Sequence, residues 1–72
     1  MNFLNQITEA ANRGDPEAQY QLALFYYKGN ILAKDLSKAV ELYEKAAQQG
    51  SAKAQYNLAV CYEQGLGVSK NQ

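Results

Sequence analysis

The 72-residue sequence contains no histidine and a single cysteine, Cys61. Histidine is the usual side-chain base near neutral pH and the commonest metal ligand, so its absence removes the simplest routes to acid-base catalysis and metal binding. One cysteine excludes an internal disulfide framework and favours a reducing compartment. We expect Cys61 to be a small buried apolar residue rather than a reactive thiol. The sequence therefore predicts no catalytic residue, no metal ligand and no cofactor.

The sequence also lacks an excess of either charge, because seven Lys and Arg residues balance seven Asp and Glu residues. No basic run is interleaved with aromatic residues, so nucleic acid is not an expected partner. Residues 1–6 carry no positive charge and no long apolar run, and we expect neither a signal peptide nor a membrane partner. A cytoplasmic location follows as an expectation, although a longer parent protein could carry signals that this chain lacks.

The carboxylates form no convincing catalytic pair. Glu41 and Glu44 share a helix face, but Lys38 and Lys45 lie nearby, a pattern typical of ordinary exposed helix charge. Gly65 and Gly67 do not make a phosphate-binding loop, because the fingerprint is incomplete and follows a helix rather than a strand.

The chain nearly repeats itself every 36 residues. Residues 18–29 contain Ala-Gln-Tyr-x-Leu-Ala-x-x-Tyr-x-x-Gly, and the same pattern returns at residues 54–65. Eleven of the 36 superimposed positions are identical, among them the Ala-Ala pairs that begin at Ala10 and Ala46. Self-similarity at this period is typical of a solenoid, in which each repeat buries its apolar face by stacking on its neighbours.

Helical spacing of apolar residues predicts four helices and no strand. We expect a first helix within residues 1–14, a full two-helix repeat over 15–50, and the start of the next repeat, without its second helix, over 51–72. Asp15, Asp35 and Ser51 are the expected N-caps. Glycines 14, 29, 50 and 65 are expected to end the four helices. The prediction is one all-α unit of antiparallel helix pairs.

These motifs, together with Ala-x-x-Leu-Tyr-x-x-Ala-Ala-x-x-Gly at residues 39–50, resemble the Sel-one-like repeat (SLR) family, relatives of tetratricopeptide repeats. The resemblance covers essentially the whole chain. It implies a right-handed superhelix that acts as a non-enzymatic adaptor for protein complexes. The loop that starts at Gly29 departs from the family's Gly-x-Gly-Val turn, which residues 65–68 keep, so we expect the first loop to be less tightly turned.

Comparison of the two copies divides the second expected helix, which runs to about Tyr27 and ends at Gly29, and its counterpart into an identical face and a variable face. The resemblance implies that this type of helix lines the concave surface, where a protein or peptide would bind. The polar and tyrosine members of the variable face are the candidate protein-binding residues: Glu17, Gln21, Tyr27, Lys28, Lys53, Asn57, Glu63 and Gln64. Its apolar members, Leu24, Phe25, Val60 and Cys61, are expected to pack between repeats. Tyr20 and Tyr56 are identical in both copies and are expected to stack.

An alternative function is head-to-tail self-association. The fourth helix lacks its covalent partner, so its apolar face would be exposed to water at a cost of about 25 cal/mol per Å². The first helix of another molecule occupies the missing partner's place in the repeat, which predicts a fibre, a ring or a swapped dimer. The residues expected to mediate this contact are Phe3, Leu4, Ile7, Leu58 and Tyr62. A fragment or engineered unit of a longer array would have the same open face.

A third alternative is β-lactam chemistry, which is attributed to some secreted members of the family. Those members carry paired cysteines that this sequence lacks, and no Ser-x-x-Lys motif is present. We therefore expect a binding protein rather than an enzyme.

Overall fold

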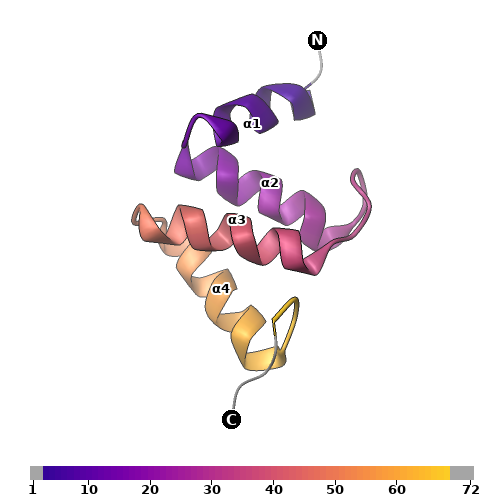
Figure 1. Cartoon of the computed structure of the whole chain (residues 1–72), viewed down its shortest axis with the longest axis vertical. Coiled ribbons are helices and arrows are strands. Elements are labelled where there is room, and N and C mark those ends of the chain that lie inside the picture. The colour runs from indigo at the N-terminus through magenta and orange to yellow at the C-terminus, as the bar shows by residue number, and fades with distance from the viewer. Residues whose placement is uncertain (1–2, 69–72) are drawn as a thin grey trace.

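The computed structural model describes residues 3–68, and that range contains four α-helices and no strand. They are α1 (Phe3–Asn12), α2 (Pro16–Lys28), α3 (Leu36–Gln48) and α4 (Ala52–Gln64). Successive helices run in opposite directions along a molecule of 44 × 26 × 15 Å, with α1 and α4 at its two ends (Figure 1). The all-α prediction of antiparallel helices is confirmed. The first helix was expected within residues 1–14, of which residues 1–2 lie outside the described range.

Three side chains begin helices at the positions that the sequence predicts. The Oδ1 atoms of Asp15 and Asp35 each accept a backbone N–H from the following helix at 3.0 Å, and the Oγ atom of Ser51 accepts one at 3.2 Å. These bonds satisfy donors that have no partner within the helix. Pro16 occupies the first turn of α2, where its missing N–H costs nothing. The helix starts are therefore determined locally.

Helices α2 and α4 end at glycines in the left-handed conformation, Gly29 with φ 71° and Gly65 with φ 72°. The loops that follow them differ. Gly67 has φ 75°, and a Cβ atom there would overlap the carbonyl oxygen of Leu36, so the second loop closes tightly on the start of α3. The equivalent residue in the first loop is Ile31, whose side chain is 62% exposed. The two loops thus differ in conformation at the position where one has Gly67 and the other has Ile31.

The core is built from small residues that let the helices approach and larger ones that fill the space between them. Ala23, Ala39, Ala46 and Ala54 are completely buried. The largest fully buried side chains are Tyr43 of α3 and Cys61 of α4. Leu22 and Leu42 are also buried, as the sequence predicts, whereas Tyr26 and Ala47 are only partly buried.

Coverage of the helices is uneven. Helix α2 packs against both α1 and α3, and its contact with α3 is the most extensive between any two helices of the described chain. Helix α4 packs chiefly against α3. Among residues 3–68, no helix covers the other side of α4.

Candidate protein-binding face

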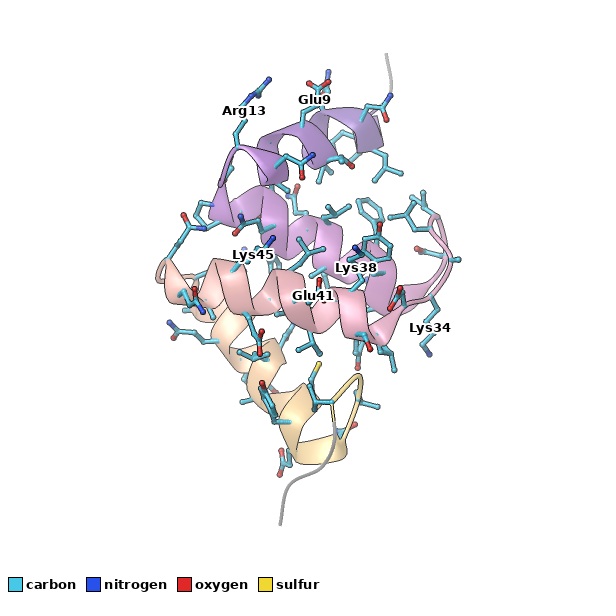
Figure 2. The ribbon with its side chains drawn as sticks, in the orientation of Figure 1. Glu9, Arg13, Lys34, Lys38, Glu41 and Lys45 are labelled. Carbon is cyan, nitrogen blue, oxygen red and sulfur yellow. The ribbon has the colours of Figure 1, made fainter. Side chains whose placement is uncertain are left out.

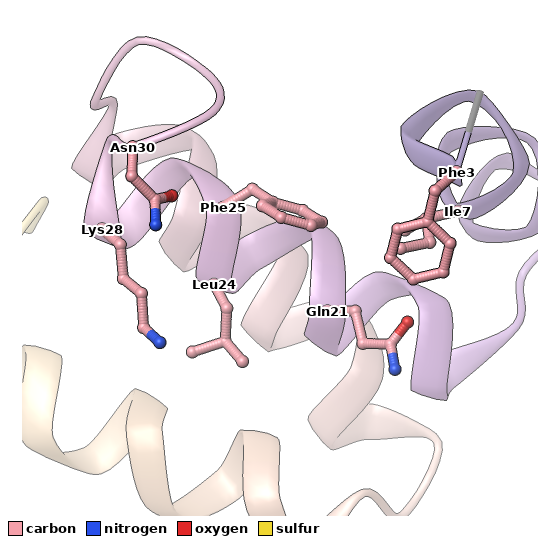
Figure 3. A pocket seen from close by; sticks show the side chains of 7 residues that line it. All are labelled: Phe3, Ile7, Gln21, Leu24, Phe25, Lys28 and Asn30. Carbon is pink, nitrogen blue, oxygen red and sulfur yellow. The ribbon is translucent and has the colours of Figure 1, made fainter.

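A pocket of about 260 Å³ lies between α1 and the C-terminal half of α2. Phe25 of α2 points toward Phe3 and Ile7 of α1, whereas Leu24 and Lys28 project from another side of the same helix (Figure 3). Gln21 and Asn30 complete the lining. The pocket, called here the α1/α2 pocket, thus combines an apolar floor with amide groups and one cation at its edge.

Tyr20 of α2 contacts Tyr43 of α3, and two residues of α4, Lys53 and Asn57, border this contact. The ring centroids of Tyr20 and Tyr43 are 6.0 Å apart and their planes are tilted by 46°, a favourable aromatic geometry. Tyr27 lies close enough to influence the ionisation of Tyr43. The Nζ atom of Lys53 lies 5.8 Å from the centroid of the Tyr20 ring, within cation–π range. We call Tyr20, Tyr27 and Tyr43 the tyrosine cluster.

Tyr43 is the buried member of the cluster, with 1% of its surface exposed. Its hydroxyl oxygen accepts a hydrogen bond from Asn57 Nδ2 at 3.2 Å. Burial raises the pKa of Tyr43 to about 12, and the Asn57 bond opposes this shift without cancelling it. Tyr43 is therefore neutral at physiological pH, and the Lys53 cation lies over the ring of its neighbour Tyr20.

The structure groups most of the eight candidate protein-binding residues around these two features. Gln21 and Lys28 line the α1/α2 pocket. Tyr27, Lys53 and Asn57 belong to the tyrosine cluster or contact it.

Three of the eight candidates lie elsewhere. Glu17 accepts a hydrogen bond from Gln21 Nε2 at 3.3 Å and lines a second depression with Lys53, at the starts of α2 and α4. Glu63 and Gln64 are exposed near the end of α4 and line none of the pockets described here. The binding role of all eight stays a prediction.

Sequence comparison did not assign binding roles to Phe3, Ile7 or Asn30, which line the α1/α2 pocket. Phe3 and Ile7 were expected at a self-association contact instead. Ile7 is only 6% exposed and packs within its own chain, whereas Phe3 is 64% exposed. The 36-residue repeat could have predicted that both residues lie beside α2, because α1 precedes α2 in the repeat as α3 precedes α4.

The apolar members of the variable face contribute to packing. Cys61 is 1% exposed, and burial raises the pKa of its thiol, so the expectation of a buried apolar residue is confirmed. Leu24 and Phe25 pack against the core while remaining partly accessible, and Val60 is also partly buried.

The carboxylates of α3 have ordinary surroundings. Figure 2 shows Lys38, Glu41 and Lys45 following one another along this helix. Glu44 accepts a hydrogen bond from the Tyr62 hydroxyl at 2.7 Å, which raises the pKa of Tyr62. Among residues 3–68, no three potential ligands of the His, Cys, Asp and Glu types come together to hold a metal ion. Nor is any helix in that range long and apolar enough to cross a bilayer.

Antiparallel helices, joined by short loops and built on a 36-residue repeat, define an α-solenoid, a class of helical repeat protein. The sequence profile of the Sel1 repeat matches residues 16–51 and 52–72, so this chain belongs to the Sel1 repeat family. Members of the family are generally non-enzymatic helical repeat proteins that mediate protein–protein interactions. No curated protein matches the chain significantly.

Solved structures of the family resemble this one closely. The Sel1 repeat protein from Oxalobacter formigenes has a TM-score of 0.91 and 38% identity, over 96% of this chain and 52% of that one. The antigen c5321 of uropathogenic Escherichia coli has a TM-score of 0.89 and 35% identity, over 99% and 15% of the two chains. Helicobacter pylori cysteine rich protein B has a TM-score of 0.92 and 27% identity, over 99% and 56%. This chain thus spans about half of two relatives and a smaller part of the third.

Proposed function

We propose that this chain is a protein-interaction module that binds a peptide segment along α2, with an apolar anchor in the α1/α2 pocket and acidic groups near its lysines. The observation that carries the proposal is the pocket itself, where Leu24 and Phe25 remain partly accessible beside the cation of Lys28. Peptide-binding surfaces commonly combine one apolar anchor site with polar groups at its rim.

The tyrosine cluster supports a contact that continues beyond the pocket. Tyr20 and Tyr27 are both partly exposed, and each offers an apolar ring with a hydroxyl at its end. Lys53 adds a second cation beside Tyr20. With Lys28 at the pocket and Lys53 at the cluster, an acidic segment would meet a cation at both places and be oriented by them.

A binding role without catalysis is part of the proposal. The carboxylates of Asp15 and Asp35 cap helices, and the hydroxyl of Ser51 does the same. These groups are thus occupied in maintaining the fold. Head-to-tail association, the second function that the sequence predicts, would use the open side of α4 together with residues of α1, two of which, Phe3 and Ile7, also line the α1/α2 pocket.

The test begins with a phage-displayed library of random peptides selected on the wild-type protein. We expect the selected peptides to share an aromatic or aliphatic anchor flanked by Asp or Glu. Synthetic copies are expected to lose about tenfold in affinity for Lys28→Glu, because an attraction becomes a repulsion at the rim. Fluorescence anisotropy of labelled peptides measures this loss.

The matched control is Lys45→Glu, the same charge reversal in a different depression, between α1, α2 and α3. It is expected to leave peptide affinity within about twofold of wild type. Equal losses for the two variants would contradict a contact at the α1/α2 pocket, and so would a library that yields no binder.

A further inference from the structure

Helix α4 carries an uncovered copy of the surface with which α2 holds α3. Residues 36 positions apart are called equivalent here, and Ala23 of α2 is completely buried whereas its equivalent, Ala59, is exposed. Tyr56 is 71% exposed and Tyr62 is 46% exposed, although the equivalent tyrosines of α2 are both partly buried. We call Gln55, Tyr56, Leu58, Ala59 and Tyr62 the α4 outer face.

The hydrogen bonds of the equivalent glutamines Gln19 in α2 and Gln55 in α4 differ by one partner. Gln19 of α2 is 4% exposed; its Nε2 donates to Ala11 O at 3.2 Å, and its Oε1 accepts from Gln49 Nε2 at 2.9 Å. Gln55 repeats the first bond, to Ala47 O at 3.1 Å. No donor to Gln55 Oε1 occurs among the described residues, and the residue equivalent to Gln49 would be supplied by a following helix.

Helix α1 occupies the same position in the 36-residue repeat as the helix that would follow α4. It is equivalent to α3, and it lies at the opposite end of the molecule from α4 (Figure 1). We propose that α1 of a second copy of this chain docks on the α4 outer face, as α3 docks on α2. The stripe of α1 that would make the contact is Gln6, Ala10 and Arg13, the equivalents of Leu42, Ala46 and Gln49.

The donor to Gln55 would then be Arg13 of the second copy. Within residues 3–68, the one ion pair of Arg13 is with Glu9, at 3.7 Å, and both side chains are largely exposed. Exposed pairs of this kind contribute little to stability, so Arg13 can be redirected at low cost. A guanidinium in place of the Gln49 amide would make a charge-assisted hydrogen bond to Gln55 Oε1. A second copy therefore fits the open acceptor.

Gln6 sets the strength of the contact. Its equivalent, Leu42, lies with Leu22 and Tyr26 in the lining of one depression between α1, α2 and α3. In the docked pair, Gln6 would face Leu58 and Tyr62 and would bury less apolar surface than leucine does. We therefore expect weak association that grows with concentration. Because the two contacting surfaces differ, each added copy leaves a new α4 outer face open, and growth does not stop at a dimer.

The experiment measures mass against concentration by light scattering behind size-exclusion chromatography and by sedimentation. For wild type we expect the mass to rise above the 8.0 kDa of a single chain as concentration increases. Gln6→Leu restores the α3 pattern at an exposed position of α1, and it is expected to tighten association by about tenfold or more. This gain cannot result from misfolding.

Ala59→Glu places a charge at the centre of the α4 outer face and is expected to keep both wild type and Gln6→Leu at 8.0 kDa. Gln64→Glu is the matched control, since it adds the same charge to an exposed position of α4 that lies outside the α4 outer face and whose equivalent in α2, Lys28, is also exposed. It is expected to leave association unchanged. Circular dichroism verifies that each variant is folded.

Constant mass of 8.0 kDa for both wild type and Gln6→Leu would overturn the proposal, as would association that Ala59→Glu does not weaken. A synthetic peptide of residues 35–49, which contains the sequence of α3, tests whether the α4 outer face binds an α3-type helix instead of α1. If it shifts the NMR signals of the α4 outer face in a chain that stays monomeric, the surface accepts α3-type helices and not α1. Peptide binding at the α1/α2 pocket is unaffected by Ala59→Glu, so this proposal and the proposed function can fail separately.

Discussion

Tyr43→Ala is expected to abolish cooperative folding of this protein. The Tyr43 side chain is 1% exposed, packs on Tyr20 and accepts a hydrogen bond from Asn57, so its removal leaves a large cavity and an unpaired amide. Truncating a buried aromatic residue to alanine costs about 3–5 kcal/mol. The core of so small a chain contributes only about 3–5 kcal/mol in total. Urea and thermal unfolding followed by circular dichroism would show a broad transition or none.

The control for this prediction is Tyr56→Ala, the same substitution at a tyrosine that is 71% exposed. Its effect on the free energy of unfolding is expected to stay within about 0.5 kcal/mol, as for most surface substitutions. If the two variants unfold alike, Tyr43 is not the central packing residue that its burial indicates.

Ionisation of the Tyr43 hydroxyl is expected to lower the free energy of unfolding at alkaline pH. Burial raises its pKa from 10.0 to about 12, so the unfolded chain releases the proton before the folded chain does. The resulting stabilisation is fully present below the unfolded pKa and is lost as pH rises through the folded pKa. Relative to Tyr43→Phe, the wild type should lose roughly 2–3 kcal/mol of unfolding free energy over that interval. Urea titrations of both proteins across this range measure the difference, and parallel pH profiles would contradict it.

The helices were predictable because their start and stop signals are local. Asp15, Asp35 and Ser51 cap helices through bonds within the next turn, and Gly29 and Gly65 end them by backbone conformation alone. Each signal acts over a few residues, so it can be found without knowledge of the tertiary structure. The 36-residue repeat then gives the order in which the helices stack.

The candidate site was predictable only in part, because its contacts join residues from different repeats. Lys53 lies over the ring of Tyr20, and Asn57 bonds to Tyr43, pairings that depend on how α4 is placed against α2 and α3. Comparison of the two copies identifies Lys53 and Asn57 as variable but cannot pair them with particular tyrosines. The α1/α2 pocket was missed for the same reason, since Phe3 and Phe25 meet only in the folded chain.

Burial of the identical face was the least predictable property, because it depends on the neighbouring helix and not on the residue. Gln19 and Gln55 make the same bond to the preceding helix, yet Gln19 is buried and Gln55 is exposed. The difference is the presence of α3 over α2 and the absence of an equivalent helix over α4 among the described residues. Identical sequence therefore predicts identical contacts with the preceding helix only.

Because α3 covers α2 and no described helix covers α4 in the same way, we expect alanine-to-glutamate substitution to have very different effects on stability at the equivalent positions Ala23 and Ala59. Ala23→Glu is expected to cost roughly 3 kcal/mol or more, because a charged side chain enters a fully buried position between α2 and α3. Ala59→Glu is expected to change the free energy of unfolding by no more than about 0.5 kcal/mol, since its position is exposed. Urea unfolding at low protein concentration compares the two variants.

Both alanines lie within the same local sequence, Leu-Ala-x-x-Tyr, so helix propensity contributes equally to the two substitutions. Glu63 lies four residues after Ala59 where Tyr27 follows Ala23, and its like charge adds about 0.2–0.5 kcal/mol to the cost of Ala59→Glu alone. The difference between their costs therefore measures how much stability the covering helix gives to this surface. If a second copy covers α4, the cost of Ala59→Glu should rise toward that of Ala23→Glu as protein concentration increases, because assembly stabilises only the folded chain. Equal costs at low concentration would mean that α4 is already covered in the single chain, contrary to the exposure of Tyr56 and Tyr62.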